Sequence, residues 1–203
     1  MQHSVLRQKI NLNSPLKETN KLLLWLFIFV LVAVDQLSKF LTKSNLELGE
    51  SISILPWFKV FFIENNGFAF GLEIFGKYGK LALTLTRIFF VSFLIFWFSR
   101  LLKYKNINNM LILSFCLVIS GAIGNIIDSV FYGYIYGYAP IFYGKVVDML
   151  YFPILETTIP SWIPFLGGNK FSFFKYVFNL ADSYITVGAF ILFFSYKYIP
   201  SKL

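Results

Sequence analysis

Four long apolar stretches constrain this chain more than any other feature. They cover residues 22–37, 81–98, 110–127 and about 179–198, and the last has no charge from residue 184 to residue 196. About 20 apolar residues in a helix are enough to cross a bilayer. No small-residue cleavage site follows the first stretch, so we expect a retained helix there. The sequence therefore predicts an all-α membrane protein with four transmembrane helices.

The composition supports a membrane protein and argues against several other classes. Of the 203 residues, 57% are hydrophobic and 14% are charged, whereas about 25% are charged in soluble proteins. The net charge of +8 could suggest nucleic acid binding. However, the basic residues flank the apolar stretches and form no single basic face. Cys116 is the only cysteine in the sequence and His3 is the only histidine. The sequence therefore predicts no disulfide framework, no metal cluster and no histidine base.

The four predicted helices place both termini and the short loop at 100–109 on one side of the membrane. The long loops at 42–80 and 129–177 then lie on the other side. The first side has nine Lys and Arg residues, and the long loops have seven spread over many more residues. This distribution predicts that the first side is cytoplasmic. The expected organisation is a basic N-terminal tail, a membrane domain and a short C-terminal tail, at residues 1–21, 22–198 and 199–203.

The first long loop is expected to form a small β-rich region outside the cytoplasm. Residues 51–54 and 57–63 have β-rich composition, and Pro56 lies between them. The triplet Asn65-Asn66-Gly67 that follows is a turn signal. It is either a simple turn or a loop whose amide groups orient a substrate near the membrane surface.

Two carboxylates stand out because apolar residues surround them. Asp148 follows two valines, and Asp182 lies where the last apolar stretch begins. An ionisable group in such a place is costly and is a functional-site hypothesis by default. If the two carboxyls meet, both cannot ionise easily, so one keeps or shares a proton. Such a pair can activate water and donate a proton, as in aspartic proteases. The alternative is two unrelated interfacial carboxylates.

Other polar residues have both a structural and a functional interpretation. Asp35 and Lys39 are four residues apart, so they share a helix face and can form an ion pair, with Lys39 extending to the membrane interface. Asn125 and Asp128 are three residues apart and could belong to a hydrogen-bond network inside the bundle.

Small residues recur at a spacing of four in the third apolar stretch. They are Cys116, Ser120 and Gly124, and Gly121 lies beside them. Small side chains at this spacing allow another helix to approach closely. The pattern predicts a tight helix contact on this face.

Five polar segments lie in order at the ends of the predicted helices or in the loops. They are Asp35-Gln36-Leu37-Ser38-Lys39, Asn65-Asn66-Gly67-Phe68-Ala69-Phe70, Gly124-Asn125-Ile126-Ile127-Asp128, Val146-Val147-Asp148 and Phe178-Asn179-Leu180-Ala181-Asp182-Ser183. In this order they resemble the five motifs of lipoprotein signal peptidase (signal peptidase II). The resemblance extends from about residue 22 to 198. The family consists of membrane aspartic peptidases that cleave bacterial prolipoproteins just before a cysteine carrying diacylglycerol.

The resemblance implies a role for each matching residue. Asp148 and Asp182 would be the catalytic dyad. Asp128 would be structural, although it is the alternative to Asp148 as a catalytic partner. The residues expected to support the site or bind substrate are Asp35, Lys39, Asn65, Gly67, Asn125, Asp128, Asn179 and Ala181. No metal or cofactor is implied. The expected partners are prolipoprotein signal peptides and membrane lipid, not nucleic acid. A monomer is expected in the bacterial inner membrane, with its site near the extracytoplasmic face.

Two features depart from the family pattern. The family commonly has Arg directly after the third motif's Asp, whereas this chain has Ser129, and Lys145 is one candidate to replace that contact. The second long loop also looks longer than usual. Its stretch at 151–176 is rich in proline and aromatic residues. We expect this stretch to lie at the outer membrane surface, over the site, because aromatic residues suit that depth.

Two other functions are compatible with the residues. A small proton- or cation-coupled transporter could use the acidic residues Asp35, Asp128, Asp148 and Asp182. A transport pathway would spread them through the membrane, whereas here they cluster towards one end of the helices. A non-enzymatic scaffold would not need paired Asp residues beside Asn-bearing motifs. Hydrolysis without a covalent intermediate is favoured, and the assignment of base and acid stays open because a coupled pair titrates as a unit.

Overall fold

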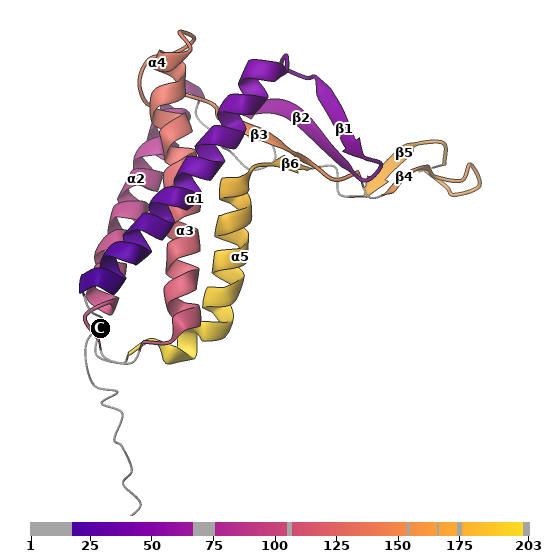
Figure 1. Cartoon of the computed structure of the whole chain (residues 1–203). Coiled ribbons are helices and arrows are strands. Elements are labelled where there is room, and N and C mark those ends of the chain that lie inside the picture. The colour runs from indigo at the N-terminus through magenta and orange to yellow at the C-terminus, as the bar shows by residue number, and fades with distance from the viewer. Residues whose placement is uncertain are drawn as a thin grey trace, which may run out of the picture.

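The fold consists of a bundle of helices and an arm of β-strands that extends from one end of the bundle (Figure 1). The computed structural model describes residues 18–66, 76–104, 107–153, 155–165, 167–173 and 176–200. The four main helices are α1 (Glu18–Asn45), α2 (Gly76–Leu101), α3 (Asn109–Ile127) and α5 (Leu180–Ser195). A π-helical turn (Asp128–Tyr132) and the short α4 (Gly133–Ile135) extend α3, and a 3-10 turn (Tyr196–Tyr198) ends α5.

Three helical stretches in the described part of the chain are long and apolar enough to cross a membrane. They are Asn20–Asn45, Tyr78–Leu101 and Asn109–Ile135. The fourth helix of the bundle, α5, has 16 residues and is about 24 Å long at 1.5 Å per residue. A hydrocarbon core is about 30 Å thick. The structure thus shows a helical membrane protein, and α5 is shorter than the sequence analysis expected.

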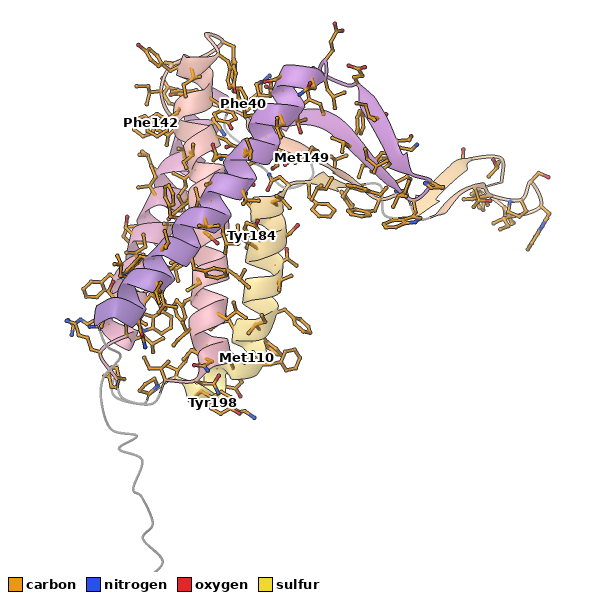
Figure 2. The ribbon with its side chains drawn as sticks, viewed as in Figure 1. Phe40, Met110, Phe142, Met149, Tyr184 and Tyr198 are labelled. Atoms are coloured by element: carbon orange, nitrogen blue, oxygen red, sulfur yellow. The ribbon has the colours of Figure 1, made fainter. Side chains whose placement is uncertain are left out.

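The helices run side by side, and α3 contacts each of the other three. In Figure 1 α1 begins and α5 ends at the same end of the bundle, while α4 and the strands lie at the opposite end. The start of α1 and the end of α5 are therefore close to the same end of the bundle. Apolar side chains project outward along the helices (Figure 2), and Phe29, Phe89 and Phe193 are among the exposed ones. Such a surface suits contact with lipid.

Two small antiparallel sheets form the arm. The larger has the strand order β1 (Ser51–Leu55), β2 (Phe58–Asn65), β3 (Val146–Tyr151) and β6 (Val177–Phe178). The smaller pairs β4 (Leu155–Thr158) with β5 (Lys170–Phe173). The β-rich first loop expected from the sequence is confirmed, whereas the strands of the second loop were not expected. Pairing of β2 with β3 joins the two loops.

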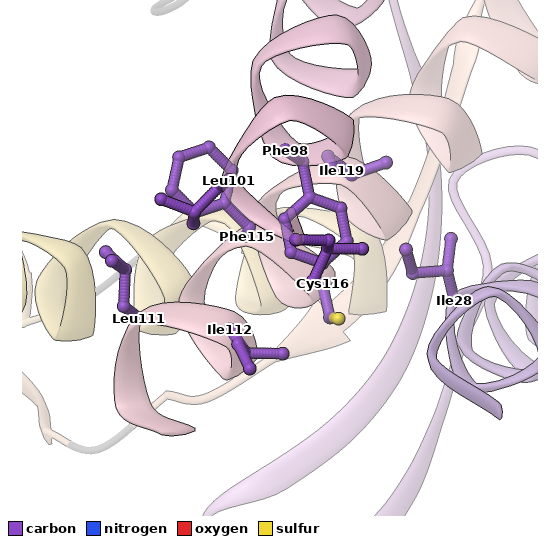
Figure 3. Close-up of a cluster of buried hydrophobic side chains, with 9 residues drawn as sticks. Ile28, Phe98, Leu101, Leu111, Ile112, Phe115, Cys116 and Ile119 are labelled. Atoms are coloured by element: carbon purple, nitrogen blue, oxygen red, sulfur yellow. The ribbon is translucent and has the colours of Figure 1, made fainter. Parts of the chain in front are cut away.

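Apolar packing is concentrated at the end of the bundle where α2 ends and α3 begins. The buried side chains there come from α1, α2, α3 and the residue after α2, and Figure 3 shows Leu101, Cys116 and Ile119 beside Phe98 and Phe115. These two rings are 5.5 Å apart and nearly parallel. The cluster comprises Ile28, Phe98, Leu101, Leu102, Leu111, Ile112, Phe115, Cys116 and Ile119. A smaller apolar cluster lies at the opposite end, beside the polar residues, and comprises Leu46, Phe62, Tyr132, Val147 and Met149.

The tight helix contact predicted on α3 is present, and its partner is α5. A Cβ atom added at Gly121 would overlap the carbonyl oxygen of Ala181, and one at Gly124 would lie 2.5 Å from Oδ2 of Asp35. The two glycines therefore let α3 approach both α5 and α1. This approach brings the polar residues of the three helices together.

Candidate active site

Asn179 begins α5 and fixes Asp182 in the first turn of this helix. The Asn179 side-chain oxygen accepts a hydrogen bond from the backbone N–H of Asp182 at 2.8 Å. In return, Oδ2 of Asp182 accepts from the backbone N–H of Asn179 at 3.3 Å. Asn is a preferred residue at this position because its side chain satisfies an otherwise unpaired helix N–H. The positive end of the helix dipole also favours a carboxylate there.

The same asparagine also reaches Asp148 on β3. Its Nδ2 donates to Oδ1 of Asp148 at 2.7 Å, and the Asn65 side chain donates to Oδ2 of Asp148. Asn65 ends β2, where pairing with β3 places it opposite Val146. Asp148 is only 3% exposed. The two carboxyls that are 34 positions apart in sequence thus contact one residue, Asn179.

Asn125 on α3 joins Asp182 to a buried cation. Its Nδ2 donates to Oδ1 of Asp182 at 2.8 Å, and its Oδ1 accepts from Nζ of Lys39 at 3.0 Å. A lysine ammonium group only donates hydrogen bonds. The amide oxygen of Asn125 must therefore face Lys39, and this orients its NH2 group towards Asp182.

Lys39 is the centre of a fully buried ionic cluster. Its Nζ lies 2.9 Å from Oδ2 of Asp35 and 2.8 Å from Oδ2 of Asp128, and all three side chains are 0% exposed. With Asn125, these carboxylates give the ammonium group three acceptors for its three protons. The ion pair of Asp35 with Lys39 is therefore present, but the alternative in which Lys39 extends outward is wrong, because its side chain is fully buried. Lys39 points inward because its three hydrogen-bond acceptors, on Asp35, Asp128 and Asn125, lie inside the bundle.

The carboxylates of this cluster also hold the backbone around the site. Asp35 accepts from the backbone N–H of Ala181 at 2.9 Å, which ties α1 to the first turn of α5. Asp128 accepts from the backbone N–H of Val147 at 3.2 Å and from Gln36 at 2.9 Å. Asp128 thus supports β3 beside Asp148.

Burial dominates the acid–base properties of Asp148. Loss of solvent and the nearby charge of Asp182 raise the pKa of Asp148 to about 7, although hydrogen bonds from Asn65 and Asn179 oppose the shift. Both forms of Asp148 are therefore populated near neutral pH. A carboxyl with a pKa near the working pH is suited to general acid–base catalysis.

Ser129 contacts two cations of α2. Its buried hydroxyl lies 3.3 Å from Nη1 of Arg87 and 3.4 Å from Nζ of Lys80. Lys80 also donates to the backbone carbonyl of Asn66 at 3.0 Å. Lys145, the candidate replacement for the family's arginine, instead lies 3.7 Å from Glu64 and is partly exposed. The positive charge beside Ser129 therefore comes from α2.

Lys80, Arg87 and Gln36 are site residues that the sequence analysis did not identify. Arg87 had a usable signal, because a lone charge within an apolar stretch is a functional-site hypothesis. Lys80 lies at the expected end of a loop, where a basic residue is ordinary. Only the packing of α2 beside Ser129 distinguishes it.

The structure brings most of the expected site residues into one hydrogen-bonded network. Gly67 lies outside the described residues. The stretch at 151–176 does not lie over the site as expected, because β4 and β5 are at the end of the arm farthest from the bundle (Figure 1). Within the ranges that the structure describes, no three His, Cys, Asp or Glu side chains are arranged to hold a metal ion.

Comparison with known proteins gives consistent matches. A family model described as signal peptidase (SPase) II matches residues 27–197. The chain is 41% identical over 191 residues to the lipoprotein signal peptidase of Porphyromonas gingivalis, covering 87% of this chain and 83% of that protein. It is 38% identical over 166 residues to the lipoprotein signal peptidase of Amoebophilus asiaticus, covering 77% of this chain and 70% of that protein.

Two solved structures, each described as a bacterial membrane enzyme, have a similar fold. Both give a TM-score of 0.60, with sequence identities of 22% and 23%. The first covers 86% of this chain and 87% of the solved chain. At these identities the likeness concerns the fold.

Proposed function

Since the chain belongs to the signal peptidase II family, we propose that it removes the signal peptide from prolipoproteins that carry diacylglycerol on a cysteine, cutting just before that cysteine. The observation that carries the proposal is the contact of Asn179 with both Asp148 and Asp182. Two carboxyls held around one residue, one of them buried with a raised pKa, are suited to acid–base hydrolysis of a peptide bond.

The proposed mechanism is direct attack by water, with Asp148 and Asp182 as the catalytic dyad. The ionised carboxyl takes a proton from water as its oxygen attacks the scissile carbonyl carbon. The protonated carboxyl then donates its proton to the leaving nitrogen as the C–N bond breaks. The pair holds one proton before the attack, two in the tetrahedral intermediate and one again after the amine leaves, and it titrates as a unit. Asn65, Asn125 and Asn179 keep both carboxyls oriented.

The surrounding residues support this mechanism in different ways. Asp35 and Lys39 hold Asn125 and the first turn of α5 in place. Asp128 fixes the backbone of β3 next to Asp148. Arg87 and Lys80 supply positive charge at Ser129, next to Asp128. We include Gly67 and Ala181 among the residues that shape the substrate-binding part of the site.

The proposed topology has α1, α2, α3 and α5 as four membrane-embedded helices in the bacterial inner membrane. Residues 22–198 form the peptidase domain, and the tails at 1–21 and 199–203 are cytoplasmic. The loops at 42–80 and 129–177 then lie on the extracytoplasmic side. The three apolar spans and the Lys and Arg distribution support this orientation. One chain supplies the whole network, which supports a monomer.

The test is cleavage of a purified diacylglyceryl-modified prolipoprotein by the full-length protein in detergent or lipid nanodiscs. The variants are Asp148→Asn, Asp182→Asn and Asp128→Asn. Glu64→Gln is the matched control, because Glu64 lies on the same sheet but pairs with Lys43 and Lys145. Thermal unfolding of every variant is measured alongside to separate loss of catalysis from loss of fold.

We expect the wild type and Glu64→Gln to cleave, and folded Asp148→Asn and Asp182→Asn to be inactive. Asp128→Asn should lower the melting temperature, and the fraction that stays folded should still cleave the substrate. Normal cleavage by folded Asp148→Asn or Asp182→Asn would refute the dyad. Absence of cleavage by well-folded wild type would refute the substrate assignment.

A further inference from the structure

The β4–β5 hairpin exposes an unusually apolar tip. Residues 157–169, which include the turn between the strands, contain no charged residue. Within this turn, Trp162 is 79% exposed and Phe165 is fully exposed. Large apolar side chains exposed together mark a surface that contacts another apolar phase.

The backbone at the tip has an unusual conformation at Phe165. Phe165 has a φ of +65°, in the left-handed region that non-glycine residues rarely adopt. The hairpin therefore accepts an unfavourable backbone conformation at a residue whose ring contacts no core. Strained residues of this kind cluster at functional sites, so the tip is a candidate for one.

The length of α5 sets the level at which the arm leaves the bundle. The larger sheet passes through β6 and Asn179 directly into α5, which has 16 residues and is about 24 Å long. The neighbouring helical stretch Asn109–Ile135 has 27 residues and is about 40 Å long. The arm thus starts well below the end of α4, near the edge of a hydrocarbon core about 30 Å thick. Figure 1 shows it directed away from the helices at this level.

Stacked aromatic rings connect the arm to the candidate active site. Trp57, in the turn between β1 and β2, lies 6.3 Å from the ring of Phe152, which lies 5.7 Å from the ring of Phe178. Phe178 directly precedes Asn179, the residue that contacts both carboxyls. The position of the arm is therefore mechanically linked to the position of the site.

We propose that the β4–β5 hairpin is a membrane-interface anchor whose tip, with Trp162 and Phe165, inserts among the phospholipid headgroups and upper acyl chains. Its partner is the bilayer in which the helices lie. Trp suits this depth because its ring is largely apolar and its N–H group can bond to water or headgroups. Through the aromatic row, the anchor holds Asn179 at a fixed depth. The proposal depends on the membrane setting and not on peptidase activity.

The test measures the depth of Trp162 by fluorescence quenching. Trp25, Trp57 and Trp97 are changed to Phe, and the full-length protein is reconstituted in phosphatidylcholine and phosphatidylglycerol vesicles. Quenchers are lipids brominated near the headgroup, lipids brominated near the chain end, and aqueous iodide. A second probe, Phe165→Trp with all four native tryptophans changed to Phe, tests the tip at another position. Phe165→Cys labelled with an environment-sensitive fluorophore keeps the native tryptophans, since the one native cysteine, Cys116, is buried. It covers the case in which replacing the tryptophans misfolds the protein.

A matched control is Tyr134→Trp in the same tryptophan-free background. Tyr134 is 70% exposed, which is close to the exposure of Trp162, but it lies on α4 beyond the level of the arm. We expect iodide to quench the tryptophan at 134 at least twofold more than Trp162. We expect shallow brominated lipids to quench Trp162 more than deep ones do.

Two results would overturn the proposal. The first is iodide quenching of Trp162 as strong as that of N-acetyltryptophanamide in solution, with no effect of brominated lipid, which would place the tip in water. The second is protection from both iodide and brominated lipids, which would mean that a protein surface covers the tip. Because no cleavage is measured, either result leaves the proposed function separately testable.

Discussion

At the scale of single residues, Asn179 performs two tasks that are usually separate. Its side-chain oxygen caps α5, while its side-chain nitrogen contacts Asp148, Asn125 and the carbonyl of Val147. A structural requirement of the helix and a requirement of the site thus fall on one amide. These tasks can be separated by a residue that caps equally well but has no NH2 group.

Asn179→Ser should therefore reduce activity more than it affects the start of α5. Serine caps about as well as asparagine, but it cannot reach Asp148 as Nδ2 does. We expect cleavage to fall about 100-fold, the scale of a misplaced catalytic group. The lost hydrogen bonds should cost about 1–3 kcal/mol. Cleavage rates and thermal unfolding in detergent measure both effects.

Asn108→Ser is the matched control, since Asn108 caps α3 through the N–H of Met110 at the other end of the bundle. It should change neither activity nor stability appreciably. A folded Asn179→Ser variant with wild-type turnover would mean that the contact with Asp148 has no role.

Asp148 also predicts a pH dependence of stability. Its pKa rises to about 7 in the folded protein, against about 3.9 in an unfolded chain. Between these values the folded state binds more protons, so stability decreases as pH rises from about 4 to 7. The full loss is about 4 kcal/mol at most, at 1.36 kcal/mol per pKa unit.

Asp148→Asn cannot ionise and so lacks this loss. We expect the melting temperature of the variant, relative to wild type, to be higher at pH 8 than at pH 5. Asn108→Ser should follow the wild-type curve over the same range. Parallel curves of melting temperature against pH for Asp148→Asn and wild type would show that folding does not raise the pKa of Asp148.

At the scale of elements, the contact between α3 and α5 positions the site. Gly121 lies against the backbone of Ala181, one residue before Asp182, and Asn125 follows one helical turn later on α3. The distance between the two helices therefore determines whether Asn125 can donate to Asp182. Small residues give this contact its closeness.

Gly121→Ala should separate the helices and weaken both stability and activity. The added methyl group would overlap the Ala181 carbonyl and lie 2.8 Å from the Ile185 side chain. Overpacking of this kind costs about 1–3 kcal/mol. Thermal unfolding and cleavage are the measurements. Ala189→Leu, which adds a larger side chain on the exposed face of α5, should change neither, and a harmless Gly121→Ala would contradict the close contact.

At the scale of the whole molecule, the larger apolar cluster and the buried ionic cluster lie at opposite ends of the bundle. The aromatic cluster around Phe98 and Phe115 packs where α2 ends and α3 begins. Buried charges centred on Lys39 lie at the opposite end, where the arm begins. Buried ion pairs contribute little net stability but are costly to break, so this cluster specifies how the helices are arranged.

Lys39→Met should destabilise the protein by about 3–5 kcal/mol, because Asp35 and Asp128 lose their cation while buried. A variant that also carries Asp35→Asn and Asp128→Asn has no charge left in the cluster and should recover much of the loss. Thermal unfolding compares the two variants, and cleavage shows whether the charges matter beyond folding. If the neutral variant is no more stable than Lys39→Met, uncompensated charge is not the cause.

Residue patterns along the chain were enough to predict the membrane class, the helix-forming stretches, the β-rich stretches at 51–54 and 57–63, and many of the polar residues that the structure brings together. Each of these depends on local properties, namely apolar length, alternation and motif order. The small-residue pattern at Gly121 and Gly124 likewise predicted a close helix contact. It did not identify α5 as the partner, because a helix face contains no record of what packs against it.

Only the tertiary structure determines which positions that are distant in the sequence contact each other. Asp35 and the backbone of Ala181 are 146 positions apart, and Asp148 reaches Asn65 because β2 pairs with β3 in one register. The inward position of Lys39, the two cations at Ser129 and the direction of the β4–β5 hairpin are of the same kind. Local sequence specifies which groups are costly to leave unpaired, whereas the packing of α1, α2, α3 and α5 determines which partners are within reach.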